Sequence, residues 1–167
     1  MLTYATVADM VARFGELELV QLTDLINIPP STVDAARVET KLGDAAAFID
    51  GYVGQVYRLP LAGCAKPPAT PDGIVQYVAP PVLTRLTCDL ARYYLYDDLA
   101  PEHEVYRRYK AALGELEAIA GGRAQLACPW GGSPGELIGS DAQSGSAETY
   151  SDFAPRAVTS ATLRGFG

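Results

Sequence analysis

The chain has 167 residues, 49% of them hydrophobic and 20% charged, which is the composition of one globular domain rather than of a disordered or collagen-like protein. Its formal net charge of −7 argues against a protein that mainly grips phosphate backbones, because that affinity comes mostly from Lys and Arg. No signal-peptide pattern and no apolar run approaching ~20 residues is found, so we expect synthesis in the cytoplasm and no membrane partner.

The cysteines give no sign of a disulfide framework or of a zinc site. Cys64, Cys88 and Cys128 are odd in number, far apart and outside any CxxC or CxxH spacing. We therefore expect three unpaired cysteines, buried or incidental, and neither a metal nor a cofactor.

The first half of the chain predicts three helices. Thr6 is a suitable N-cap for a short amphipathic helix over 6–14, and a second short helix is expected over 16–22. Beyond Pro29 and Pro30, apolar residues at intervals of three or four predict a long helix over 33–56.

Three glycines interrupt this long helix, at positions 43, 51 and 54. Each lowers the helix preference by about 1 kcal/mol relative to alanine. We therefore expect another backbone to lie close to them, and the alternative is sequence drift without a structural role.

The second half opens with a proline-rich segment. Six of the twelve prolines lie within 59–81, which predicts an extended loop. Pro80 and Pro81 suit the start of a helix that runs to about 98, and a further helix is expected over 102–120, antiparallel to it. Residues 123–127 could form one strand. The predicted fold is mainly α, a small antiparallel helical bundle with a long Pro-rich loop, an extended C-terminal arm and room for one or two short strands.

The end of the chain differs in composition. Ten of the twenty-one residues 131–151 are Gly or Ser, which is typical of a linker. We therefore divide the chain into a helical domain over 1–127, a linker over 128–151 and a docking arm over 152–167. Such a linker spans roughly 25 Å on average, so the arm can leave its own domain.

An acidic turn is the main candidate for chemistry. Asp97, Asp98, Glu102 and Glu104 could in principle hold a cation or run acid–base chemistry. The spacing matches no calcium loop, and negative charge at a helix start is favoured by the helix dipole. His103, the single histidine, has no serine or cysteine nucleophile beside it. We expect no catalytic residues and no enzymatic activity.

Five tyrosines lie on the two facing helices of the second half: Tyr93, Tyr94, Tyr96, Tyr106 and Tyr109. A stacking platform for single-stranded nucleic acid would need a positively charged groove, which this acidic chain does not offer. A helix–helix core with a tyrosine rim suited to an interface is the preferred interpretation.

Four segments carry a family resemblance. They are YATVADMVARFGELELVQLTD, DAAAFIDGYVGQVYRLPL, PPVLTRLTCDLARYYLYDD and VYRRYKAALGELEAIAGGRAQL. In this order they resemble the head completion, or head–tail connector, proteins of Mu-like phages and prophages. The final ATLRGFG is similar to the arginine-plus-aromatic ends of such adaptors.

The resemblance implies a structural adaptor in the neck of the virion. It implies a ring of about twelve copies that joins the DNA-filled capsid to the tail and surrounds the exit channel. The implied partners are the portal protein, neighbouring copies, a tail-side stopper or terminator protein, and DNA that passes without specific binding. The alternative is a helical DNA-binding or packaging accessory protein.

The expected contact residues lie in two segments. In the arm they are Phe153, Arg156, Val158, Leu163, Arg164 and Phe166, which would touch the portal or an adjacent copy. A secondary interface is expected at Tyr57, Leu59, Pro60 and Tyr77. The alternative for the arm is a disordered terminus.

Overall fold

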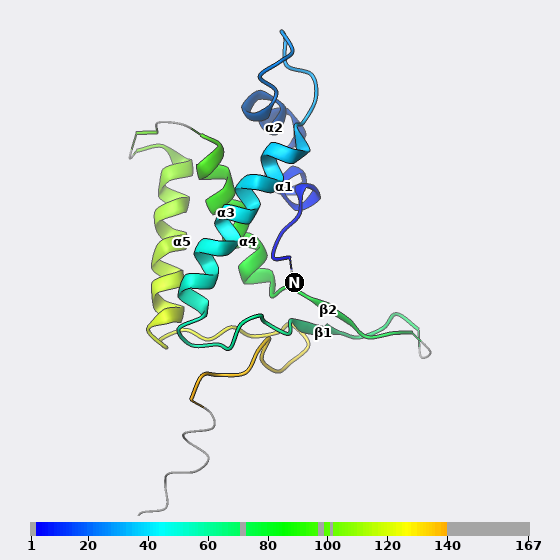
Figure 1. The fold of residues 1–167 in the computed structure, drawn as a ribbon, viewed down its shortest axis with the longest axis vertical. Coiled ribbons are helices and arrows are strands. Elements are labelled where there is room, and N and C mark those ends of the chain that lie inside the picture. The colour runs from blue at the N-terminus through cyan, green and yellow to red at the C-terminus, as the bar shows by residue number, and fades with distance from the viewer. Residues whose placement is uncertain (1–2, 71–72, 97–98, 101, 140–167) are drawn as a thin grey trace, which may run out of the picture.

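The computed structural model describes residues 3–70, 73–96, 99–100 and 102–139 (Figure 1). The helices are α1 (Val7–Phe14), α2 (Glu16–Thr23), α3 (Ala35–Val53), α4 (Pro81–Leu95) and α5 (Glu104–Ala120). The strands are β1 (Cys64–Lys66) and β2 (Gln76–Val78). The predicted mainly α fold is confirmed, and each predicted helix is present within a few residues of its expected ends. None of the described helices combines the length and apolar character needed to cross a membrane.

Local caps explain where the helices begin. Thr6 and Asp9 form a capping box, in which each side chain accepts a hydrogen bond from the other's backbone N–H. Gly15 has φ of 87°, a conformation that favours glycine, and turns the chain directly from α1 into α2. Asp34 caps α3, and Pro81 stands at the start of α4, where its missing N–H costs nothing.

The core forms around α3. This helix packs against α4, α5 and α1, while α4 and α5 run antiparallel beside each other (Figure 1). Burying one large apolar side chain stabilises the fold by about 1.5–3 kcal/mol. Fully buried members of the core include Met10, Leu19, Val38, Ile49, Val53, Leu83, Leu86, Leu90 and Leu116.

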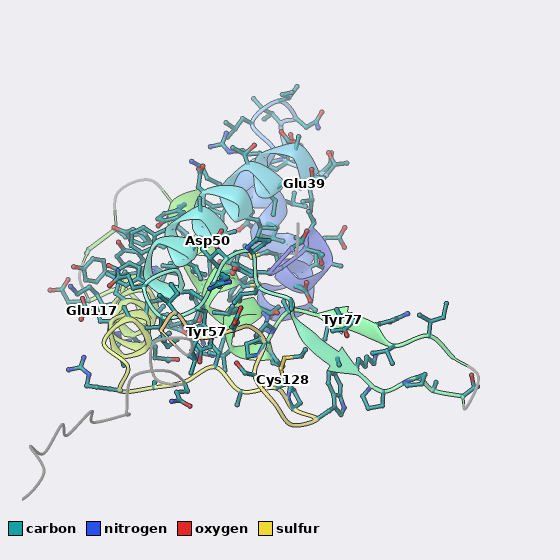
Figure 2. All side chains as sticks on the ribbon, turned by 60° about the horizontal axis from the view of Figure 1, so that its bottom comes forward. Glu39, Asp50, Tyr57, Tyr77, Glu117 and Cys128 are labelled. Carbon is teal, nitrogen blue, oxygen red and sulfur yellow. A yellow bond between two sulfur atoms is a disulfide. The ribbon has the colours of Figure 1, made fainter. Side chains whose placement is uncertain are left out.

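The proline-rich segment forms a ribbon of two antiparallel strands, in which Cys64 lies opposite Val78. The ribbon extends away from the helices in both views (Figures 1 and 2). The extended loop is therefore confirmed, and the two short strands lie within it, where no strand was predicted. The strand expected over 123–127 is wrong, because Leu126 donates its N–H to the Tyr57 hydroxyl at 2.8 Å rather than to a neighbouring strand.

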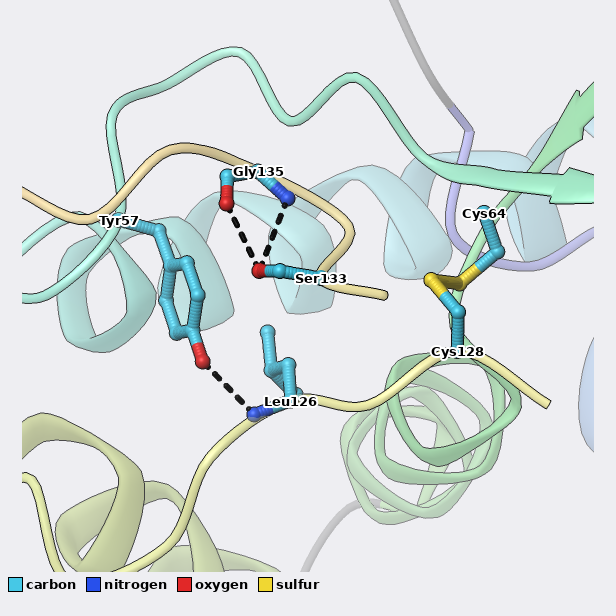
Figure 3. Close-up of a disulfide and its surroundings, with 6 residues drawn as sticks. All are labelled: Tyr57, Cys64, Leu126, Cys128, Ser133 and Gly135. Carbon is cyan, nitrogen blue, oxygen red and sulfur yellow. Dashed lines mark hydrogen bonds between the residues drawn. A yellow bond between two sulfur atoms is a disulfide. The ribbon is translucent and has the colours of Figure 1, made fainter. Parts of the chain in front are cut away.

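Cys64 and Cys128 form a disulfide, with their Cα atoms 5.3 Å apart (Figure 3). The prediction that these two cysteines are unpaired is wrong. It relied on spacing along the chain, whereas the fold brings together residues separated by 64 positions. Cys88 is unpaired and fully buried, and burial raises the pKa of its thiol to about 11.

The folded domain continues beyond residue 127. Three backbone hydrogen bonds of 2.7–2.9 Å attach the following segment: Gly63 N–H to the Pro134 carbonyl, Arg58 N–H to that of Glu136, and Ile138 N–H to that of Val56. Residues 128–139, predicted as the start of the linker, therefore belong to the domain. Residues 140–167, with the rest of the predicted linker and the whole arm, lie outside the described residues.

Two of the three α3 glycines face open space. A Cβ added at Gly43 or Gly51 would meet nothing within 4 Å. At Gly54 it would lie 2.8 Å from the Asp50 carbonyl oxygen and 3.0 Å from the Leu59 side chain. Within one chain, the expected close backbone is therefore wrong for Gly43 and Gly51.

Candidate functional site

The described end of the acidic turn, at His103 and Glu104, starts α5. The His103 side chain caps α5 by accepting a backbone N–H at 3.2 Å, and Glu104 forms an ion pair with Arg108 at 2.7 Å. Asp97 and Asp98 lie outside the described residues. Among the residues that are described, no group of three His, Cys, Asp or Glu side chains could hold a metal ion.

The loop between α2 and α3 is organised by the carboxylate of Asp24. At distances of 2.9–3.2 Å it accepts hydrogen bonds from the backbone N–H groups of Ile26, Asn27, Ser31 and Thr32 and from the Asn27 side chain. These bonds hold the pKa of Asp24 well below its usual range, and the bond from the Ser31 N–H has the largest effect. The carboxylate is therefore charged at neutral pH and holds the loop in one shape.

This loop presents three large apolar side chains to solvent. Leu25 is 69% exposed, Ile26 89% and Ile28 98%, and the loop forms the end of the molecule beyond α2 (Figure 1). We call Leu25, Ile26 and Ile28 the apolar loop. Several adjacent exposed apolar side chains on an ordered backbone are typical of a contact surface.

The β ribbon, residues 64–70 and 73–78 of the described chain, forms a second exposed surface. Ile74 is 88% exposed and Tyr77 61%, and the Cys64 disulfide fixes the ribbon's root to the body. A two-stranded ribbon is only marginally stable in water, and both of its outer edges present unpaired backbone groups. The ribbon would therefore gain stability from a partner that covers it.

The third surface is an apolar groove of about 790 Å³. Its walls come from residues 3–5, from 42–50 of α3 and from 59–61. Of the described residues that line it, Asp50 alone carries a charge, and its carboxylate accepts a hydrogen bond from the Tyr4 hydroxyl. Burial and this bond raise the pKa of Tyr4, which therefore stays a donor.

The sequence-predicted contact residues occupy different environments. Tyr57 is 1% exposed, so it is a core residue, and its place in a secondary interface is wrong for this fold. Leu59 and Pro60 line the groove, and Tyr77 stands exposed on the ribbon. The arm residues Phe153, Arg156, Val158, Leu163, Arg164 and Phe166 lie outside the described residues.

The tyrosines of α4 and α5 form a half-buried cluster. The rings of Tyr93 and Tyr109 are stacked with centroids 4.0 Å apart, and Tyr106 meets Tyr93 edge-on at 6.0 Å. These contacts join the two helices. The use of the cluster's rim as an interface stays a prediction.

Sequence reasoning missed the loop around Asp24 and the groove. An aspartate followed by Asn and Ser between two helices is a common pattern of side-chain bonds to local backbone, and it could have indicated the loop. The groove has no such signal, because its walls come from three separate segments.

Comparison with known proteins shows to which family the chain belongs. Residues 4–136 match the model of a family described as Bacteriophage Mu, Gp36. The chain is 32% identical over 126 residues to gene product J of Escherichia phage Mu, covering 73% of this chain and 74% of that protein. It is 29% identical over 126 residues to the Mu-like prophage FluMu protein gp36 of Haemophilus influenzae, covering 75% and 77%. The chain therefore belongs to the Bacteriophage Mu Gp36 family.

Proposed function

We propose that this protein is a structural head–tail connector of a Mu-like phage. Copies form a ring below the portal, join the DNA-filled capsid to the tail and line the exit channel. The protein is made in the host cytoplasm, resides in the neck of the virion and catalyses no reaction. Its partners are the portal protein, its own neighbouring copies and a tail-side stopper or terminator protein.

The observation that carries the proposal is the presence of three apolar surfaces on one small body. The apolar loop lies at the end of the molecule beyond α2, the β ribbon extends away from the helices (Figure 1), and the groove is lined by residues of 3–5, 42–50 and 59–61. Monomeric proteins rarely leave several such surfaces uncovered. Different surfaces that fit one another allow head-to-tail contacts, which close into rings when the rotation between copies permits.

The negative net charge favours a protein that does not bind DNA tightly. The net charge of −7 disfavours adhesion to a phosphate backbone, so DNA can slide past such a ring. In the DNA-binding alternative, α2 would be the recognition helix. That helix exposes Glu16, Leu17 and Gln21, whereas Glu18 is bonded to Arg92 of α4. Reading base edges favours Arg, Lys, Asn or Gln, and of these three exposed residues Gln21 alone is of that kind, while Glu16 repels phosphate, so the connector role is better supported.

The proposal is tested by measuring the mass of the purified full-length protein with and without the portal protein of its phage. A ring-sized complex that requires both proteins is the expected result. A protein that stays separate from portal, or that binds duplex DNA tightly at low salt, would contradict the connector role and favour the alternative.

The same measurement after deletion of residues 152–167 tests the arm. If Phe153, Arg156, Val158, Leu163, Arg164 and Phe166 make the main contact, the truncated chain stays outside the complex. Unchanged assembly of the truncated chain would assign docking to the helical domain.

A further inference from the structure

We infer that the β ribbon of one copy lies in the apolar groove of a second copy. The inference rests on the proposed ring and names the contact between its neighbouring subunits. The donor is the described part of the ribbon, residues 64–70 and 73–78, and the acceptor is the groove over α3.

The ribbon has the chemistry of an inserted element. Ile74, Val75 and Tyr77 are 88%, 46% and 61% exposed, and all three lie on or beside β2. Its pairing with β1 leaves the outer edge of each strand available for further backbone hydrogen bonds. An apolar cleft would take these side chains out of water.

The groove has the shape to accept a strand. Its α3 wall consists largely of small residues, Gly43, Ala46 and Ala47. A Cβ at Gly43 would meet nothing within 4 Å, so open space lies directly above the helix backbone. Small residues allow another backbone to approach closely, which a wall of Leu or Phe would prevent.

The charges of the two surfaces are complementary. Lys66 is the charged side chain among the described residues of the ribbon, and it is exposed. Asp50 is the charged residue among those that line the groove. A ribbon in the groove can therefore bring the Lys66 ammonium to the Asp50 carboxylate, and no two like charges are buried together.

The contact belongs between copies rather than within one chain. The disulfide of Cys64 fixes the ribbon's root, and the ribbon carries Tyr77 away from the helical body on which Asp50 lies (Figure 2). Each copy thus presents both a ribbon and a groove, which are built from different residues. This is a head-to-tail contact in which every copy gives one ribbon and receives one, as a closed ring requires.

Photo-cross-linking of the full-length protein tests the inference. Tyr77 is replaced by p-benzoylphenylalanine, the concentrated protein is irradiated, and the products are separated under denaturing conditions and mapped by mass spectrometry. We expect products of dimer mass and above that join a ribbon peptide to the α3 peptide containing Ala46 and Ala47.

Two glycines of α3 are each replaced in the protein that carries p-benzoylphenylalanine at position 77, which gives a matched pair of variants. Both Gly43 and Gly51 are exposed and have nothing within 4 Å of an added Cβ, so leucine at either should leave the fold intact. Gly43 lines the groove and Gly51 does not. Gly43→Leu should reduce the dimer product at least tenfold, whereas Gly51→Leu should leave it unchanged. Circular dichroism confirms that both variants are folded.

Several results would overturn the inference. They are an absence of dimer product, a cross-link within one chain, a cross-link to a surface other than the groove, or equal yields from the two glycine variants. These failures are distinct from failure of the connector role. If the protein joins portal but gives no cross-link that depends on Gly43, only the ribbon contact is rejected. If the cross-link forms but the protein does not associate with portal, only the connector role is rejected.

Discussion

Removal of the Cys64–Cys128 disulfide should destabilise the folded domain by about 2–4 kcal/mol. The bond closes a loop across 64 positions of the chain. In the chain-entropy model, a loop of this length lowers the entropy of the unfolded state by about 14 cal/mol/K, which corresponds to about 4 kcal/mol at 25 °C. Measured effects often fall below this limit because the reduced chain keeps some structure.

The structure decides how the bond should be removed. Cys64 is fully buried and Cys128 is 9% exposed, so a reductant reaches the sulfurs slowly. The double variant Cys64→Ala/Cys128→Ala removes the bond in every molecule. For a chain of this size, about 3 kcal/mol corresponds to a fall in Tm of roughly 6–12 °C.

The assay is guanidinium unfolding followed by far-ultraviolet circular dichroism. The oxidised wild type is compared with the double variant and with Cys88→Ala, in the presence and absence of reductant. Cys88→Ala keeps the disulfide, so it should retain the difference between oxidised and reduced protein, which the double variant should lack.

The reasoning is refuted if the double variant unfolds within about 1 kcal/mol of the oxidised wild type with the same slope. It is also refuted if reductant destabilises the double variant as much as the wild type. Either result would mean that closure of this loop contributes little to the free energy of unfolding.

Three further substitutions test contacts within the domain. Tyr57→Phe should cost about 1–3 kcal/mol in chemical denaturation, because the buried Leu126 N–H loses the acceptor that lies 2.8 Å away. Arg92→Ala should cost about 3 kcal/mol in the same assay, because the guanidinium donates to Glu18 at 2.6 and 2.9 Å and both side chains are largely buried. Asp24→Asn should be less stable than the wild type at pH 7. Because the folded pKa of Asp24 is lowered, this difference should be complete above about pH 4 and shrink as the pH falls further, in denaturation curves recorded from pH 7 to 2.

Each substitution has a control elsewhere in the chain. Tyr77→Phe changes an exposed hydroxyl, and Arg108→Ala breaks an exposed ion pair, so each should cost less than about 0.5 kcal/mol. Asp44→Asn changes an exposed carboxylate that pairs with Lys41 in the same helix, and its effect should be small at every pH. A control that costs as much as its partner, or an Asp24→Asn difference that does not shrink between pH 4 and pH 2, would contradict the corresponding argument.

Local interactions made much of the fold predictable from the sequence. The apolar spacing of α3, α4 and α5, the Thr6 cap and Pro81 at the start of α4 all act within a few residues. The extended character of the proline-rich segment follows from the fixed φ and missing N–H of proline. The acidic composition disfavours nucleic-acid binding however the chain folds, because the net charge is a property of the sequence alone.

The candidate surfaces could be predicted from the sequence only in part, because some of them depend on distant segments of the chain. The exposure of Tyr77 could be expected from its place within the proline-rich segment, but the burial of Tyr57 could not. Tyr57 follows the last turn of α3, and its ring is buried where the chain returns some 70 residues later and Leu126 donates its N–H to the Tyr57 hydroxyl.

The sequence by itself thus determined the helices, the Thr6 cap, the proline start of α4, the extended segment and the family to which the chain belongs. The tertiary structure alone decided the Cys64–Cys128 bond, the attachment of residues 128–139 and the groove over α3. Each of these brings together segments that are distant along the chain. No propensity or spacing reports such contacts, because they arise only when the helices pack and the connecting segments close over them.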